Sequence, residues 1–122
     1  MTRDREQRVD ADGGNNGDRI EVETQGSTTV VRPHGEMDIV RAAGFHEALE
    51  AALASSSSQI VVDLQHLAFC DSSGLNVLLG ARNTAIDSGQ SLSLAAPGSQ
   101  FLRLLEMTGS RELFTIEPAA PF

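Results

Sequence analysis

The chain has 122 residues, of which 17 are acidic and 9 are basic, so its formal net charge at pH 7 is −8. All nine basic residues are arginines, which excludes mechanisms centred on a lysine, such as a P-loop or a Schiff base. Because the chain is acidic and has neither Trp nor Tyr, we expect no nucleic-acid partner.

The apolar runs are short and the chain has one cysteine. No run approaches the roughly 20 residues that cross a bilayer, so we expect no membrane span, and no secretory signal pattern is present. Cys70 has no second thiol with which to form a disulfide, and we interpret it as a small buried apolar residue. These features predict a cytoplasmic protein held together by packing.

The composition changes along the chain. Residues 1–18 contain few apolar side chains and a Gly-Gly-Asn-Asn-Gly stretch, which predicts a disordered acidic and polar tail. A single folded domain is expected over residues 19–118. Residues 119–122 are expected to form a short C-terminal tail.

In the folded part, β-branched runs alternate with helical periodicity. The expected elements, in chain order, are strands at 20–24 and 28–32, a helix at 42–53, a strand at 60–64, a helix at 75–86, a strand at 92–95, a helix at 101–105 and a strand at 113–116. Glycines at 89 and 109 are placed to end the second and third helices.

This order predicts an α/β fold: one domain with a mixed β-sheet of about four to five strands packed with helices. The run Ile60, Val61, Val62 and Leu64 suits a strand that is buried on both faces. We therefore expect helices on both sides of the sheet.

The segment Asp71-Ser72-Ser73-Gly74 joins a strand to the second helix. Asp and Ser are residue types that cap helices, because their side-chain oxygens accept hydrogen bonds from amides of the first turn. One cap is sufficient, and three candidates are present. At least one serine hydroxyl is therefore left for another role.

Four segments, in the same order, resemble the STAS family, and specifically its bacterial anti-sigma factor antagonists. They are Gly35-Glu36-Met37-Asp38, Ile60-Val61-Val62-Asp63-Leu64, Asp71-Ser72-Ser73-Gly74-Leu75, and 104–109 followed by 113–116. The resemblance spans residue 20 to about residue 118 and agrees with the α/β fold class.

The resemblance implies a partner switch. The serine ahead of the glycine, Ser73, would be phosphorylated by the anti-sigma factor, a serine kinase of the histidine-kinase-like (GHKL) type; Ser72 is the alternative site. The unphosphorylated form would bind this kinase and release a sigma factor, phosphorylation would abolish binding, and a metal-dependent serine phosphatase would reverse it. The chain itself would be no enzyme and would hold no cofactor or metal.

The resemblance also implies a partner-binding surface. Its expected residues are Glu36, Asp38, Asp71, Ser72, Ser73, Gly74, Leu75 and Asn76. Asp71 has two possible roles: an N-cap, or a carboxylate that orients the serine or contacts the kinase. The chain departs from the family pattern at Arg41, which shifts capping toward Asp38, and at Ser110, which is expected to loosen the end of the third helix.

Two alternatives remain open at this level. STAS-like domains also serve as accessory or scaffold subunits of lipid transporters or stress-sensing complexes, and fold alone does not distinguish these roles. A serine hydrolase would use Ser73 as the nucleophile and His34 or His66 as the base, with only Asp63 evident as a residue to orient His66. The chain has no Gly-x-Ser-x-Gly around Ser73, and its three histidines show no paired metal-ligand spacing.

Overall fold

The computed structural model describes residues 7–10 and 18–122 and contains one six-stranded mixed sheet. Its strands, in spatial order, are β1 (Gln7–Asp10), β2 (Ile20–Gln25), β3 (Thr28–Pro33), β5 (Gln59–Asp63), β7 (Ser91–Ala95) and β8 (Thr115–Glu117). β1, β2 and β3 pair antiparallel, whereas β3, β5, β7 and β8 pair in parallel. The expected α/β fold with a mixed sheet is confirmed.

A second, two-stranded sheet lies at one end of the molecule. β4 (Gly35–Met37) pairs in parallel with β6 (Leu67–Cys70). The predicted number of four to five strands was too low, because strands this short carry no alternating pattern and because β1 lies in the segment predicted as a tail.

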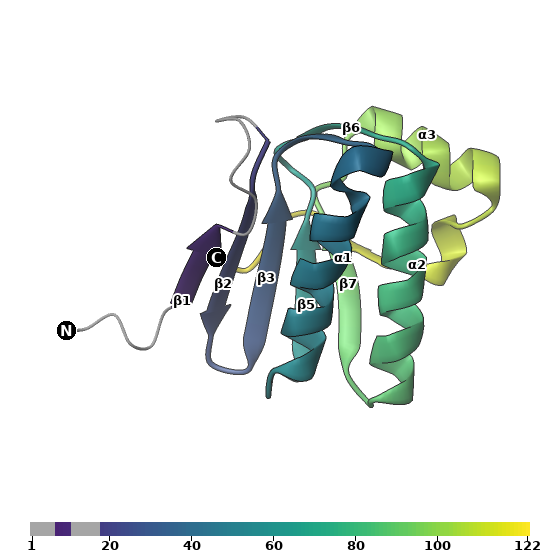
Figure 1. The fold of residues 1–122 in the computed structure, drawn as a ribbon. Coiled ribbons are helices and arrows are strands. Elements are labelled where there is room, and N and C mark those ends of the chain that lie inside the picture. The colour runs from purple at the N-terminus through teal and green to yellow at the C-terminus, as the bar shows by residue number, and fades with distance from the viewer. Residues whose placement is uncertain (1–6, 11–17) are drawn as a thin grey trace.

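Three α-helices complete the fold: α1 (Ile39–Ala54), α2 (Ser72–Asp87) and α3 (Ser99–Thr108), followed by a 3-10 turn at Arg111–Leu113. α1 and α2 lie side by side on one face of the six-stranded sheet, and both begin at the end where β6 lies (Figure 1).

The glycines predicted to end α2 and α3 do so, whereas the expectation for Ser110 is wrong. Gly89 and Gly109 have φ of +73° and +70°, a left-handed conformation that glycine adopts without strain. Ser110 does not loosen the end of α3: it is buried, its amide donates to the Leu105 carbonyl at 2.8 Å, and its hydroxyl lies 2.9 Å from that of Thr108. These bonds close the last turn.

The main core lies between the sheet and the helices. Its largest fully buried side chains include Phe45, Leu49, Ile60, Leu78, Leu94 and Leu105. These positions come from the apolar stripes of the helices and from one face of the alternating strands, so the binary pattern of the sequence accounts for this core.

The opposite face of the sheet is covered differently from the prediction. Val30, Val61 and Ala95 form a smaller buried cluster there, and Phe122 packs against it. β5, the strand predicted from the run at 60–64, is buried on both faces as expected. A C-terminal segment, and not a helix, covers its second face. Phe122, in the segment 119–122 that was expected as a C-terminal tail, packs against this buried apolar cluster.

The predicted N-terminal tail also needs a correction. Residues 7–10 form β1, in which Val9 lies opposite Val22 of β2. The free edge of β2 offers unpaired backbone groups, which an extended segment of almost any composition can pair with. The rest of that predicted tail, residues 1–6 and 11–17, lies outside the described residues.

Candidate functional site

Two helix N-termini meet at the carboxyl ends of β4 and β6. The strands are parallel, with Met37 opposite Cys70, so the residues that follow them, Asp38 and Asp71, leave the same edge of the small sheet. The Asp71 amide donates to the Met37 carbonyl at 3.1 Å, which ties the two segments together. Two of the predicted site residues are thereby neighbours.

Both aspartates cap a helix. Asp38 Oδ1 accepts from the amides of Val40 at 3.1 Å and Arg41 at 3.3 Å, as the sequence predicts for this position. Asp71 Oδ1 accepts from the Ser73 amide at 2.9 Å. The N-cap role that was one of two alternatives for Asp71 is therefore present in the structure.

The two serines are the first two residues of α2, which begins three residues earlier than predicted. Ser72 is exposed and Ser73 is half-buried. Within the described part of the chain, neither hydroxyl makes a hydrogen bond. Asp71 alone supplies the side-chain cap, so both hydroxyls are left over at the positive end of the helix dipole.

Gly74 and Leu75 have packing roles. A Cβ at Gly74 would lie 2.6 Å from Cys70 Sγ and 2.8 Å from Met37 Cγ, closer than side chains approach one another. Glycine is therefore what allows α2 to begin against the small sheet. Leu75 is buried in the core, so these two predicted partner-binding residues present no side chain at the surface, whereas Asn76 is exposed.

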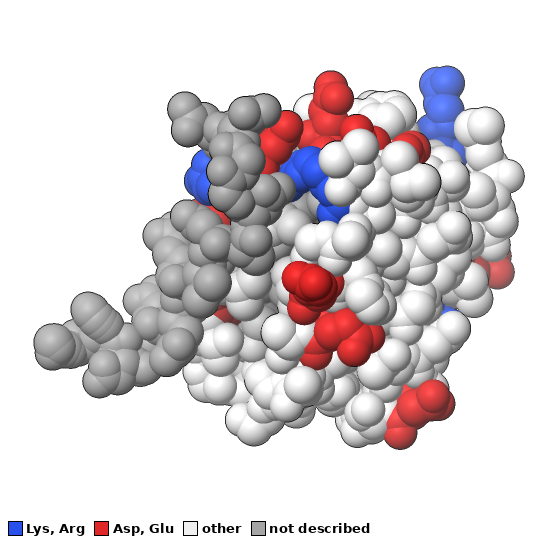
Figure 2. Space-filling view, viewed as in Figure 1, with Lys and Arg blue, Asp and Glu red and all other residues white. Residues whose placement is uncertain are grey.

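Exposed apolar side chains adjoin the two aspartates, and they were not among the predicted site residues. Ile39 is 75% exposed and Val40 82% exposed at the start of α1, and Phe69 is 42% exposed on β6, opposite Glu36. Acidic side chains gather at the same end of the molecule in Figure 2. For Val40 a signal was available, because its position lies opposite the apolar stripe of α1.

Two side chains from α1 and α3 hold the small sheet in place. The Gln100 amide accepts from the Cys70 N–H at 2.9 Å and donates to the Cys70 carbonyl at 2.8 Å, as a third strand would. Arg41 Nη1 donates to the carbonyls of His34 at 2.8 Å and Glu36 at 2.7 Å. The contact of Gln100 spans 30 residues of sequence and has no local signal.

Cys70 is fully buried between these elements. Burial, and secondarily the negative charge of Asp71, raises the pKa of its thiol to about 12. A thiol with this pKa is protonated at neutral pH and is a poor nucleophile. The interpretation of Cys70 as a buried apolar residue is confirmed.

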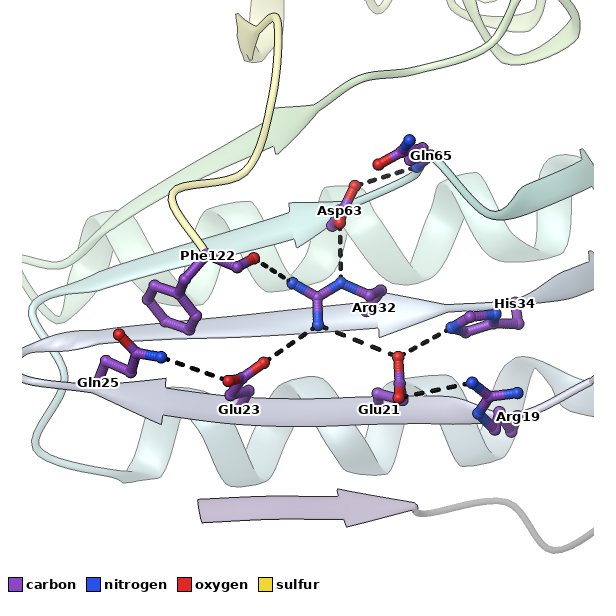
Figure 3. Close-up of polar contacts among 9 residues, drawn as sticks. All are labelled: Arg19, Glu21, Glu23, Gln25, Arg32, His34, Asp63, Gln65 and Phe122. Carbon is purple, nitrogen blue, oxygen red and sulfur yellow. Dashed lines mark hydrogen bonds and ion pairs between the residues drawn. The ribbon is translucent and has the colours of Figure 1, made fainter. Parts of the chain in front are cut away.

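The histidines are engaged away from Ser73. His34 Nε2 lies 3.0 Å from Glu21 Oε1, and its ring stacks on that of His66 with 4.6 Å between centroids. Asp63 accepts from Arg32 Nε at 2.8 Å and from the Gln65 amide at 3.1 Å (Figure 3). Within the described ranges, no hydrogen bond joins Asp63 to His66. Among the described residues, no hydrogen bond joins Ser73 to either histidine, and no group of three potential metal ligands forms.

The sequence model of the family described as "Mlab, STAS domain" matches residues 20–115, which is most of the chain. This chain belongs to the STAS domain family. The resemblance inferred from four short segments is thereby confirmed, and the segment from Asp71 to Leu75 lies inside the matched region.

Several individual proteins that are similar to this chain are named as anti-sigma factor antagonists. The anti-sigma F factor antagonist of Paenibacillus polymyxa is 32% identical over 101 residues, covering 82% of this chain and 84% of that protein. The anti-sigma-B factor antagonist of Staphylococcus aureus (strain NCTC 8325 / PS 47) is 26% identical over 97 residues, covering 80% and 90%. The solved structure of an anti-sigma factor antagonist from Mycobacterium paratuberculosis superposes with a TM-score of 0.74 at 28% identity, covering 82% and 85%.

No helix of this STAS domain, within the described residues, combines the length and apolarity that a bilayer crossing requires.

Proposed function

We propose that this STAS domain is an anti-sigma factor antagonist of the cytoplasm, where sigma factors act. In the unphosphorylated form it binds an anti-sigma factor and so releases the sigma factor. The observation that carries the proposal is the unengaged hydroxyl of Ser73 at the start of α2, beside exposed apolar residues, in a chain whose relatives bear this name.

The binding surface, called the switch face below, combines apolar and acidic side chains. Its members are Glu36, Asp38, Ile39, Val40, Phe69, Asp71, Ser72, Ser73 and Asn76. Exposed apolar side chains are the groups that gain most from burial against a partner, at about 25 cal/mol per Å² of apolar area. The acidic rim favours a partner that presents basic side chains.

The partner is a GHKL-type serine kinase that uses ATP. It transfers the γ-phosphoryl group of ATP to the oxygen of Ser73, the hydroxyl proton leaves, and ADP remains; Ser72 is the alternative acceptor. A metal-dependent serine phosphatase returns the hydroxyl by hydrolysis. This chain supplies the substrate hydroxyl and the surface, and ATP and metal belong to the partners.

Phosphorylation leaves the fold intact. Ser73 is the second residue of α2, and a dianion there lies near unpaired amides of the first turn and the positive end of the helix dipole. The fold is held by the apolar core and the caps, which the phosphate does not enter. The modification therefore acts on the surface and not on the architecture.

The same phosphate opposes binding. It adds about −1.5 to −2 charges and a hydrated group to a face that already carries Asp38 and Asp71 and must be desolvated against the partner. A cost of about 3 kcal/mol corresponds to a roughly hundredfold loss of affinity, since each 1.4 kcal/mol is tenfold. A loss of that size is sufficient to exchange partners.

Variants at Ser73 test the proposal. The chain is incubated with candidate GHKL-type kinases and ATP, phosphate is mapped by mass spectrometry, and binding is measured by calorimetry. Ser73→Ala is expected to bind the kinase and to accept no phosphate. Ser73→Glu is expected to bind about tenfold or more weakly, with a circular dichroism spectrum and melting temperature close to those of the unaltered chain.

Further variants test separately which serine is phosphorylated and which surface binds the kinase. Ser72→Ala is expected to retain phosphorylation, and phosphate found on Ser72 alone would move the site to that residue. Val40→Ser is expected to weaken kinase binding, whereas Met107→Ser, a change at a comparably exposed residue of α3, is not. Equal affinity of the phosphorylated and unphosphorylated chains for the kinase would overturn the proposal.

A further inference from the structure

A groove separate from the switch face opens between the middle of α1 and strands β2 and β3, with a volume of about 330 Å³. Volumes of this order are found for sites that hold small molecules. Its floor is formed by Val22 and the two threonines at 24 and 29, and its helical wall by Gly44, Glu47 and several alanines of α1.

The walls are made of small side chains. Gly44 lies in the interior of α1 at an ordinary negative φ, and a Cβ there would meet no atom within 4 Å. Glycine in a helix interior costs about 1 kcal/mol relative to alanine, and neither backbone conformation nor packing requires it at this position. Its effect is to leave the groove open.

One end of the groove carries hydroxyl groups with spare capacity. Thr29 Oγ1 lies 2.9 Å from Thr24 Oγ1 and 2.6 Å from Ser57 Oγ. Three hydroxyls have three protons, and the two bonds among them use two. Within the described residues no acceptor takes the third, so when the protons run from Ser57 toward Thr24 the groove presents a hydrogen-bond donor.

The rim is acidic. Glu47 lines the groove, Glu50 is exposed one turn further along α1, and the lining residues within the described part of the chain include no basic side chain. Acidic side chains lie over α1 on this face in Figure 2. A ligand with a carboxylate or phosphate head is disfavoured here by the negative charge. A hydroxyl head can accept from the donor, whereas a protonated amine is attracted by the acidic rim and can donate to the remaining lone pair of the Thr24 oxygen.

We propose that this groove binds a small amphiphile with a medium-length alkyl body and a hydroxyl or amine head. The alkyl body lies against Val22, Gly44 and the alanines of α1. The head lies between Glu47 and the hydroxyl of Thr24. This site is additional to the switch face and does not depend on the proposed antagonist function.

Titration of the full chain with three matched probes tests the proposal. Amide NMR spectra are recorded with 1-octanol, octylamine and octanoate. Saturable shifts are expected for the amides of Val22, Thr24 and Gly44 with the alcohol and the amine, and octanoate is expected to bind about tenfold more weakly. The absence of saturable shifts at the groove with alcohol and amine, or equal binding of octanoate, would overturn the proposal.

Variants of the chain test whether the ligand binds in this groove. Gly44→Leu fills the groove and is expected to abolish the ligand-induced shifts of the Val22 and Thr24 amides. Gly80→Leu is expected to retain these shifts, because Gly80 lies on α2 and a Cβ there also meets no atom within 4 Å. Both changes raise helix propensity, so both variants are expected to fold, as circular dichroism will show. Thr24→Val is expected to weaken octanol binding severalfold. Undiminished binding by Gly44→Leu would place the ligand elsewhere and contradict the proposal.

Discussion

Cys70 and Gly74 fit together where β6 leads into α2. The absence of a Cβ at Gly74 leaves the space that the Cys70 sulfur occupies, and both residues are buried. Their contact fixes how closely the first turn of α2, and with it Ser73, approaches the small sheet. A single methyl group at position 74 would displace that turn.

The pH dependence of stability follows from Cys70. The chain has no lysine and no tyrosine, so this thiol is the side chain that titrates between about pH 9 and 12. Burial raises its pKa from an ordinary value of 9.0 to about 12 in the folded chain. The unfolded chain therefore loses the proton first, and the free energy of unfolding falls as pH rises above 9, by up to about 1.4 kcal/mol per pH unit.

Urea unfolding between pH 8 and pH 11 measures this fall. Cys70→Ala, which has no thiol, is expected to lose no stability over the same interval, although its stability at pH 8 is lower because of the cavity. Identical slopes for the two proteins would show that the thiol is not responsible.

At the scale of elements, the β4–β6 pair is the least self-sufficient part of the fold. An isolated two-stranded sheet is marginally stable in water. Here Arg41 fixes the entry to β4 through two carbonyls, and Gln100 pairs with both backbone groups of Cys70. The position of the switch face therefore depends on side chains from α1 and α3.

Loss of the Gln100 contact is expected to loosen β6. In Gln100→Leu the Cys70 amide and carbonyl lose their partners, at a cost of about 1–3 kcal/mol, which corresponds to a roughly tenfold or larger rise in the hydrogen-exchange rate of the Cys70 and Asp71 amides. Gln100→Glu keeps the acceptor for the Cys70 amide, so its exchange rates are expected to lie between those of the unaltered chain and Gln100→Leu. Arg103→Leu, at an exposed residue of the same helix, serves as the control, and an equal effect there would contradict the role of Gln100.

At the scale of the whole molecule, the sheet has two unlike faces. One is packed by helices, and the other carries a buried ionic network centred on Arg32, which donates to Asp63 at 2.8 Å, to Glu23 at 3.3 Å and to the Phe122 carbonyl (Figure 3). Burial by itself lowers the pKa of Arg32, but the hydrogen bonds and charges of Asp63 and Glu23 outweigh it and raise the pKa. The network joins β2, β3, β5 and the C-terminus.

Removing the cation is expected to destabilise the whole domain. Arg32→Met leaves Asp63 buried without its counter-ion, which costs about 3–5 kcal/mol in urea unfolding. The double variant Arg32→Met/Asp63→Asn is expected to recover a large part of this loss, because the most deeply buried carboxylate of the network then carries no charge. Arg103→Met, an exposed arginine, should change stability by no more than about 0.5 kcal/mol; a comparable loss there would contradict the network's importance.

The sequence by itself determined what depends on neighbours along the chain: the aspartates that can cap α1 and α2, the glycine ends of α2 and α3, the apolar stripes, and the family signature around Ser73. Tertiary structure decided the rest: the pairing of β1 with β2, the β4–β6 sheet, the packing of Phe122 against the sheet, the Gln100 contact and the exposure of Ile39. Caps and stripes repeat within one or two helical turns, so their physical cause is local. Strand partners and coverings are chosen among segments far apart in sequence, by which free edge or apolar face remains once the main core has formed.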